Sequence, residues 1–211
     1  MTKTFQEGTW SGTFGNEYTE RSVFTLDQLN EHFINLYGYK KIDINNDFLK
    51  EFPRNIKILE IGCNVGNQLN MLQSMGFNDL YGIELQQIAV DISKKHTKNI
   101  NIIQGSALDL PFKDKYFDLV YTTGVLIHIS PDNIDQVMGE ISRVSKKYIW
   151  GLEYYNEDYI AIKYRGNENL LWKGNFPKIY MEKFPDLSLI KEKKYPYVNE
   201  KVEDQMYLLS K

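Results

Sequence analysis

The sequence predicts an α/β fold with a doubly wound, mostly parallel seven-stranded sheet that ends in an antiparallel strand pair. Short apolar runs alternate with helix-length amphipathic segments through residues 56–154, and two strand-like runs follow near the C-terminus. With 211 residues and 42% apolar content, the chain is long enough for one sizeable core and short for two. We therefore expect a single domain.

Each element has a local signal. Residues 1–45 read as an irregular arm followed by a helix over 26–36, with a partial capping box at Thr25 and Gln28 and a stop at Gly38. Apolar runs predict strands over 56–61, 80–85, 101–104, 117–122 and 148–153. Helical spacing predicts helices over 67–75 and 86–96 and a third after the fourth strand, where Ser130 is the expected cap and Pro131 the first helical residue. Such alternation gives parallel strands.

The flanks of the core, residues 46–154, are expected to cover a substrate. Aromatic residues, 14% of the chain, crowd into residues 1–40 and the stretch after Trp150. Residues 155–186 form an aromatic insertion without the strand–helix alternation, and residues 187–211 hold two closing strands over 187–195 and 206–209. Because tyrosine combines an apolar face with a polar tip, we expect the arm and the insertion to form a lid.

Composition argues against several function classes. The 25 basic and 28 acidic residues give a formal charge of -3, which provides no global basic field for nucleic acid. The lone Cys63 and three scattered histidines form no intrachain disulfide and no metal-ligand spacing. No apolar run approaches the roughly 20 residues that span a bilayer, and no signal-peptide core is present. We expect a cytoplasmic monomer or homodimer that acts on a small molecule, without metal, membrane or nucleic-acid partners.

Ligand-binding residues are expected at the carboxyl ends of the strands, near the point where strand order reverses. The first strand leads into the loop Glu60-Ile61-Gly62-Cys63-Asn64-Val65-Gly66. Glycines there let the backbone approach a ligand, and asparagine tolerates a left-handed conformation. The second strand ends in Glu84-Leu85, where an acid can accept hydrogen bonds from both ribose hydroxyls. Alone, Glu84 could be a surface acid at a helix start; with the loop, it indicates an adenosine-type ligand.

Four motifs in order, over residues 56–154, resemble those of class I S-adenosylmethionine-dependent methyltransferases. They are the Glu-x-Gly-x-x-x-Gly loop, the acid Glu84, Gln104-Gly105-Ser106-Ala107 with Leu110-Pro111-Phe112, and Phe117-Asp118-Leu119-Val120. The resemblance implies a Rossmann-like fold and S-adenosylmethionine as cofactor. Its methionine part would lie on the loop with Glu60, Gly62, Asn64 and Gly66, its ribose by Glu84 and Leu85, and its adenine by Ser106 and Ala107. The family usually has aspartate at position 106, and serine is the weaker acceptor. We add Thr123, at the end of the fourth strand, to the expected cofactor contacts.

The flanking motifs resemble a narrower family, the methylases associated with pseudaminic acid biosynthesis. They are Trp10-Ser11-Gly12-x-Phe14-Gly15-Asn16-Glu17-Tyr18-x-x-Arg21, Val125-Leu126-Ile127-His128-Ile129, Glu153-Tyr154-Tyr155 and Tyr164-Arg165-Gly166. This resemblance implies a place in bacterial nonulosonic sugar pathways, although it does not establish the methyl acceptor.

The resemblance leaves the roles of several residues open. Arg21 could pair with the methionine carboxylate and Tyr18 could shield the sulfonium, or both could be an ordinary exposed pair on a mobile arm. His128, Glu153 and Tyr154 are the catalytic candidates on the acceptor side. His128 could be a general base, or a residue that packs or orients the substrate.

Two rival function classes remain. A nicotinamide-dependent oxidoreductase would need a third glycine where this chain has Asn67. A noncatalytic cofactor-binding protein is also compatible with the sequence, since fold does not imply activity. If the protein is a methyltransferase, a sugar, a peptide and other metabolites are all possible acceptors.

Overall fold

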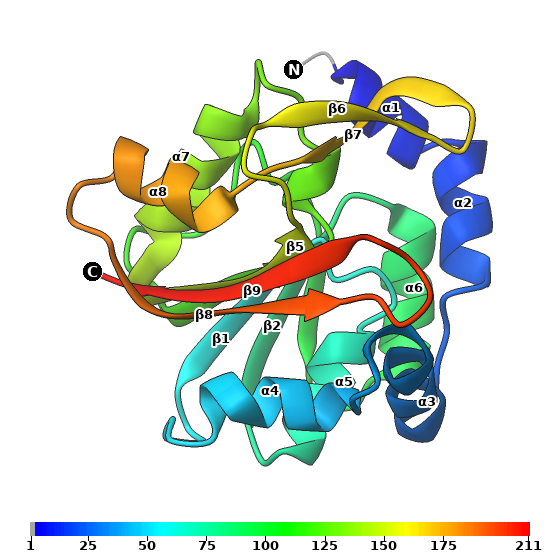
Figure 1. Ribbon diagram of the computed structural model, residues 1–211. Helices are drawn as coiled ribbons and strands as arrows, with labels where there is room; N and C mark the ends of the chain where they lie inside the picture. Colours follow the sequence, from blue (N-terminus) through cyan, green and yellow to red (C-terminus); the bar gives the residue numbers. More distant parts are fainter. Residues whose placement is uncertain (1–2) are drawn as a thin grey trace.

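The computed structural model describes residues 3–211, and its centre is a seven-stranded sheet in the order β3-β2-β1-β4-β5-β9-β8 (Figure 1). The strands are β1 (Lys57–Ile61), β2 (Asp79–Glu84), β3 (Asn101–Gln104), β4 (Phe117–Thr123), β5 (Ser145–Tyr154), β8 (Ser188–Pro196) and β9 (Glu203–Ser210). Strands β1 to β5 are parallel, and β9 runs antiparallel between β5 and β8. The expected fold class is therefore confirmed, with the reversal of strand order between β1 and β4.

Helices cover both faces of this sheet. One face packs against α3 (Leu26–Tyr37), α4 (Lys41–Leu49), α5 (Asn67–Ser74) and α6 (Gln87–His96), and the other against α7 (Ile134–Val144) and α8 (Phe176–Lys183). Along β4, Leu119 and Tyr121 point into the first core, and Val120 points into the second. Because both faces are buried, the central strands are nearly continuous apolar runs.

A third group of elements lies beside the carboxyl ends of the parallel strands. It consists of α1 (Phe5–Trp10), α2 (Thr13–Glu20), the 3-10 turn η1 (Leu126–His128) and a hairpin of β6 (Ile160–Tyr164) and β7 (Asn167–Lys173). Figure 1 shows α1 next to this hairpin at the top of the molecule. Gln6 Nε2 donates to the Asn169 carbonyl at 3.0 Å, which joins the N-terminal segment to the hairpin. We call this group the roof.

The prediction of an irregular N-terminal arm is wrong, because residues 5–20 form two helices. A capping box begins α1: Thr4 Oγ1 accepts from the Glu7 amide, and the Glu7 carboxylate accepts from the Thr4 amide. The Thr-x-x-Glu spacing that encodes this box is visible in the sequence. The predicted capping box of α3 is confirmed, since Thr25 and Gln28 make both reciprocal bonds and Gly38 ends the helix with a φ of 78°.

The start of α7 also differs from the prediction. Ser130 Oγ bonds to Asn133 Oδ1 rather than to a helix amide, and residues 131–133 form turns, so the helix begins at Ile134. The aromatic insertion, for which no elements were predicted, holds β6, β7 and α8. Helix α4 was also not predicted, because polar Lys41 and Asn45 occupy buried positions and interrupt its apolar stripe.

Gly151 in β5 tests how closely the sheet packs. A Cβ built there would lie 2.4 Å from the Tyr207 ring of β9. We expect Gly151→Ala to lower the free energy of unfolding by about 1–3 kcal/mol, measured by urea denaturation. Gly139→Ala in α7 is the control, because nothing lies within 4 Å of its added Cβ. That change should raise stability by about 0.5–1 kcal/mol. Equal effects of the two changes would contradict this packing.

Candidate functional site

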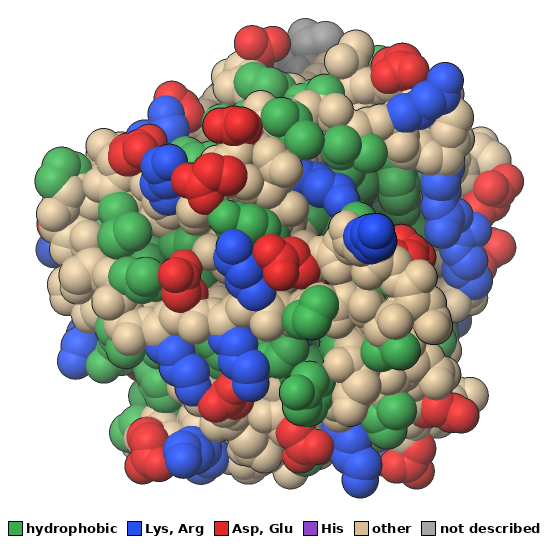
Figure 2. Space-filling model, in the orientation of Figure 1, with side chains coloured by type: hydrophobic (Ala, Val, Ile, Leu, Met, Phe, Trp, Pro, Cys, Tyr) green, Lys and Arg blue, Asp and Glu red, His purple; other side chains and the backbone are tan. Residues whose placement is uncertain are grey.

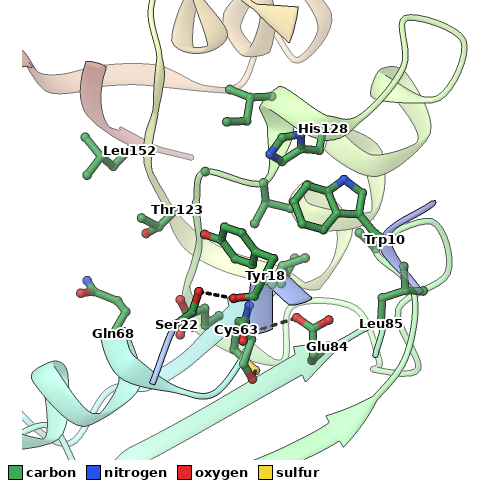
Figure 3. Close-up of a pocket in the computed structure, with 18 of the residues that line it drawn as sticks. Trp10, Tyr18, Ser22, Cys63, Gln68, Glu84, Leu85, Thr123, His128 and Leu152 are labelled. Carbon is green, nitrogen blue, oxygen red and sulfur yellow. Dashed lines mark hydrogen bonds between the residues drawn. The ribbon is translucent and has the colours of Figure 1, made fainter. Parts of the chain in front are cut away.

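A cavity of about 380 Å³ lies between the carboxyl ends of the parallel strands and the roof (Figure 3). Most of the residues that the sequence singled out line it: Tyr18, Glu60, Gly62, Asn64, Glu84, Leu85, Ser106, Ala107, Thr123, His128 and Tyr154. Figure 3 shows His128 and Trp10 on one side of the cavity and Cys63 and Glu84 on the opposite side. The expected cofactor side and the expected acceptor side therefore share one space.

The loop after β1 takes a conformation that only a few residue types allow. Gly62, Asn64 and Gly66 all have positive φ, at 67°, 46° and 82°. A Cβ on Gly62 would lie 2.6 Å from Val125 Cγ2, so a side chain there would collide with the residue that precedes η1. Gly66 does not line the cavity; it precedes α5 and faces Thr97 instead. Gly66 thus sets the shape of the loop from outside the site.

Glu84 joins the ends of β1 and β2. Its Oε2 accepts from the Asn64 amide at 2.9 Å, and its Oε1 accepts from the Gln86 amide at 2.9 Å. Burial raises the pKa of Glu84, while the backbone donors oppose that rise. Each carboxylate oxygen can accept a further hydrogen bond, because it has more than one lone-pair site. Glu84 can therefore stabilise the loop and, at the same time, accept hydrogen bonds from ligand hydroxyl groups.

At the β3 end of the cavity, Ser106 has an acidic neighbour that the sequence did not suggest. Ser106 Oγ donates to Glu7 Oε1 at 2.6 Å, and it accepts from the Leu108 amide at 3.0 Å. Glu7 lines the cavity and comes from α1. A carboxylate from the N-terminal segment therefore lies beside Ser106 in the cavity wall.

Two buried groups of opposite charge in the cavity wall each have a polar atom without a hydrogen-bond partner. Glu60, at the end of β1, is 4% exposed, and its Oε2 has no hydrogen-bond partner. Lys41, at the start of α4, is 1% exposed, and its Nζ has none either. Burial raises the pKa of Glu60 to about 8 and lowers the pKa of Lys41 to about 7. Both pKa shifts arise because burial removes water from the group and so disfavours its charged form.

His128 is fixed by the roof. Its Nδ1 lies 2.7 Å from the Leu170 carbonyl of β7, so Nδ1 is the protonated donor and Nε2 is left with a free lone pair. The ring centroid lies 4.5 Å from Trp10 and 5.4 Å from Tyr164. Burial lowers the pKa of His128 to about 4. His128 is therefore a neutral imidazole at physiological pH.

Two further predicted residues lie outside the cavity lining. Glu153 is buried beneath η1, where its carboxylate oxygens accept from the amides of Val125 and Ile127 at 3.2 and 3.4 Å. Arg21 is exposed at the end of α2, and its guanidinium carbon lies 5.5 Å from the centre of the Tyr18 ring. Neither side chain meets the space that the other candidates share.

Another end of the cavity contains an aromatic and acidic group that sequence reasoning missed. Tyr37 of α3 donates to Asp204 Oδ2, and Tyr197 donates to the same oxygen at 3.4 Å. Burial raises the pKa of Asp204 to about 6. Asp204 pairs with Tyr154 across the β5–β9 ladder. No short motif marks these residues, because they meet only through the sheet register.

Asn67 anchors the N-terminal segment to the loop helix. Its Nδ2 donates to the Ser22 carbonyl at 2.6 Å, and its Oδ1 accepts from the Phe24 amide at 3.2 Å. A glycine at this position would lose both bonds. The residue that departs from the dinucleotide-binding pattern thus holds the chain beside the cavity.

Residues 3–211 contain no helix with the length and apolar character needed to cross a membrane. The same residues contain no group of three or more His, Cys, Asp or Glu side chains placed to hold a metal ion. On the face shown in Figure 2, acidic and basic side chains are interspersed.

Comparison with known sequences supports a methyltransferase domain. Residues 59–148 match the family profile described as "Methyltransferase domain". The chain is 29% identical over 105 residues to sterol methyltransferase-like 2 of Botryococcus braunii, which covers 47% of this chain and 26% of that protein. It is 27% identical over 146 residues to demethylmenaquinone methyltransferase of Lactobacillus johnsonii, covering 62% of this chain and 59% of that protein. The chain thus spans only part of the length of these relatives.

Similarity of structure extends further than similarity of sequence. A SAM-dependent methyltransferase from Anabaena variabilis superposes with a TM-score of 0.69 at 12% identity, covering 99% of this chain and 96% of that one. At this identity the match concerns the fold, which agrees with the matched domain and with the glycine loop. Residues 59–148 therefore match a methyltransferase domain, and the whole chain has the fold of a SAM-dependent methyltransferase.

Proposed function

We propose that this protein transfers the methyl group of S-adenosylmethionine to a small-molecule acceptor, a nonulosonic sugar of the pseudaminic type or its precursor. The observation that carries the proposal is the shared cavity, in which the loop with Glu60 and Gly62 faces a roof that contains His128 and Trp10. A donor on the loop and an acceptor under the roof would meet within that space. Alignment of two reactants is the main contribution an enzyme makes when the donor is already activated.

The residues present fit the cofactor. Gly62 lines the cavity without a side chain, and buried oxygens of Glu60 and Asn64 lack hydrogen-bond partners. Glu84 would accept from the ribose hydroxyls, and Ser106 with Glu7 would face the adenine. Tyr18 lines the same cavity and would shield the sulfonium. When bound, S-adenosylmethionine supplies a methyl group on a positively charged sulfur.

On the acceptor side, His128 and Tyr154 have distinct proposed roles. His128 Nε2 has a free lone pair and would take the proton from an acceptor hydroxyl. Burial raises the pKa of Tyr154 to about 12, so its hydroxyl stays protonated and would donate a hydrogen bond to the acceptor. Thr123, at the end of β4, lines the same cavity and would limit the depth of the cofactor.

Glu153 would act as a positioning residue. Its carboxylate holds the amides of η1, the turn that ends in His128. The acidic side chain therefore influences the acceptor side through the backbone without contact with the substrate.

The sugar assignment rests on where the flanking motifs meet. Trp10, His128 and Tyr164 come from distant motifs that share the narrower resemblance, and their rings pack together in the roof. Aromatic faces with polar tips suit a ligand that presents both C–H surfaces and hydroxyl groups. A peptide or another metabolite remains the alternative acceptor, and a noncatalytic cofactor-binding protein is the rival in another class.

A labelled-methyl screen tests the proposed function. The protein is incubated with methyl-labelled S-adenosylmethionine and with nucleotide-activated sugars, free nonulosonic sugars, peptides or a crude metabolite extract. We expect label in a sugar product. Label only in peptide or in other metabolites would contradict the sugar assignment, and cofactor binding without any transfer would support the noncatalytic rival.

Glu84 tests the cofactor side. We expect Glu84→Gln to weaken S-adenosylhomocysteine binding about 10- to 100-fold in calorimetry, because a charge-assisted hydrogen bond contributes about 1.5–3 kcal/mol. Asp91→Asn, on the exposed face of α6, is the control and should bind normally. Unchanged affinity in a folded Glu84→Gln protein would remove Glu84 from the site.

His128 tests the acceptor side. We expect His128→Ala to lower kcat about 100-fold with nearly unchanged cofactor affinity, because general-base catalysis contributes 10²–10⁴-fold. The low pKa of His128 means that turnover should not fall through its protonation until the pH approaches 4, instead of near 6.5. His96→Ala, at the end of α6 and outside the cavity lining, is the control. A loss confined to KM would indicate that His128 only orients the acceptor.

A further inference from the structure

We propose that Lys41 binds the carboxylate of the methionine part of the cofactor, opposite Glu60, which binds its ammonium group. This inference rests on the proposed cofactor and assigns a residue to its charged end. The structural basis is two buried atoms of opposite charge in the wall of one cavity, Lys41 Nζ and Glu60 Oε2, neither of which has a hydrogen-bond partner. An amino acid end carries the same two charges, so each group would find its complement there.

The position of Lys41 is fixed by its helix. Asn45 lies one turn after Lys41 in α4 and exchanges two hydrogen bonds with Gln68 of α5, at 3.3 and 3.2 Å. Gln68 is the second residue of α5, directly after the glycine loop, and Figure 3 shows it beside the cavity. The amide pair therefore sets the start of α4 against the loop that would carry the methionine part.

An aromatic ring and two carboxylates attract the Lys41 ammonium group, but none of them forms a hydrogen bond with it. Its Nζ lies 4.3 Å from the centre of the Phe33 ring, and the negative charges of Glu60 and Asp204 raise its pKa against the larger effect of burial. Among the described residues, no carboxylate lies within the 4.0 Å of an ion pair with Lys41. A buried ammonium group without a hydrogen-bond acceptor is costly, and ligand oxygens would satisfy it.

Lys41 takes the role that the sequence suggested for Arg21. Arg21 lies at an exposed helix end, outside the cavity lining, whereas Lys41 lies within the lining and has a free donor. Lysine offers three donors on a compact group, which is enough for one carboxylate.

The test compares two ligands that differ only in the carboxylate. Binding of S-adenosylhomocysteine and of its decarboxylated analogue is measured by calorimetry for the wild type, Lys41→Met and Lys40→Met. Lys40 is the matched control, because it is the neighbouring lysine and is exposed. We expect the wild type and Lys40→Met to prefer S-adenosylhomocysteine at least about 10-fold, and Lys41→Met to lose that preference.

A stability measurement separates ligand binding from a structural role. If Lys41 serves the ligand, Lys41→Met without ligand should unfold at an equal or higher urea concentration, because an apolar side chain replaces a buried unpaired charge. If the substitution weakens both ligands equally, or leaves S-adenosylhomocysteine affinity unchanged, the inference is wrong while the proposed function stands. If the wild type binds neither S-adenosylhomocysteine nor S-adenosylmethionine, both are wrong. Should Lys41→Met fail to fold, Lys41→Gln provides the same comparison.

Discussion

The site depends on the hydrogen bond between the Asn64 amide and the Glu84 carboxylate. It joins the loop after β1 to the end of β2, and it stabilises a loop in which Gly62 and Asn64 adopt left-handed conformations. Without that acceptor, the Asn64 amide would be partly buried beside the cavity with no protein partner. The bond also fixes the position of the carboxylate, which lines the cavity. One acid therefore supports the local fold and lines the cavity in which the cofactor is proposed to bind.

The roof depends on the same loop through longer connections. The Asn67 side chain bonds to the backbone of Ser22 and Phe24. Thr19 of α2 donates a hydrogen bond at 3.3 Å to Gln86, which follows Glu84 and Leu85 in the chain. Gln6 then ties α1 to the hairpin that accepts from His128. The N-terminal helices thus bridge both sides of the cavity. The cavity is lined from both sides of this bridge.

The sequence predicted correctly those elements that a local pattern of residues determines. The apolar runs of β1 to β5 and the strand-end positions of Glu60 and Glu84 follow from alternation and from the topology of parallel sheets. It failed where an element depends on distant partners. The hairpin of the insertion folds against η1 and α1, and Asp204 meets Tyr37 only because β9 pairs with β5. Nothing within those short segments encodes such contacts.

Helix α4 shows why the missed structure and the missed site coincide. Its stripe is interrupted by Lys41 and Asn45, so the apolar period that marks a buried helix is weak. These two residues are also those that face polar partners: Asn45 bonds with Gln68, and Lys41 points a free ammonium group at the cavity. A core position occupied by lysine costs stability in the protein without ligand. Such a residue is best explained by a ligand that offsets the cost, so breaks in local consistency indicate where function is located.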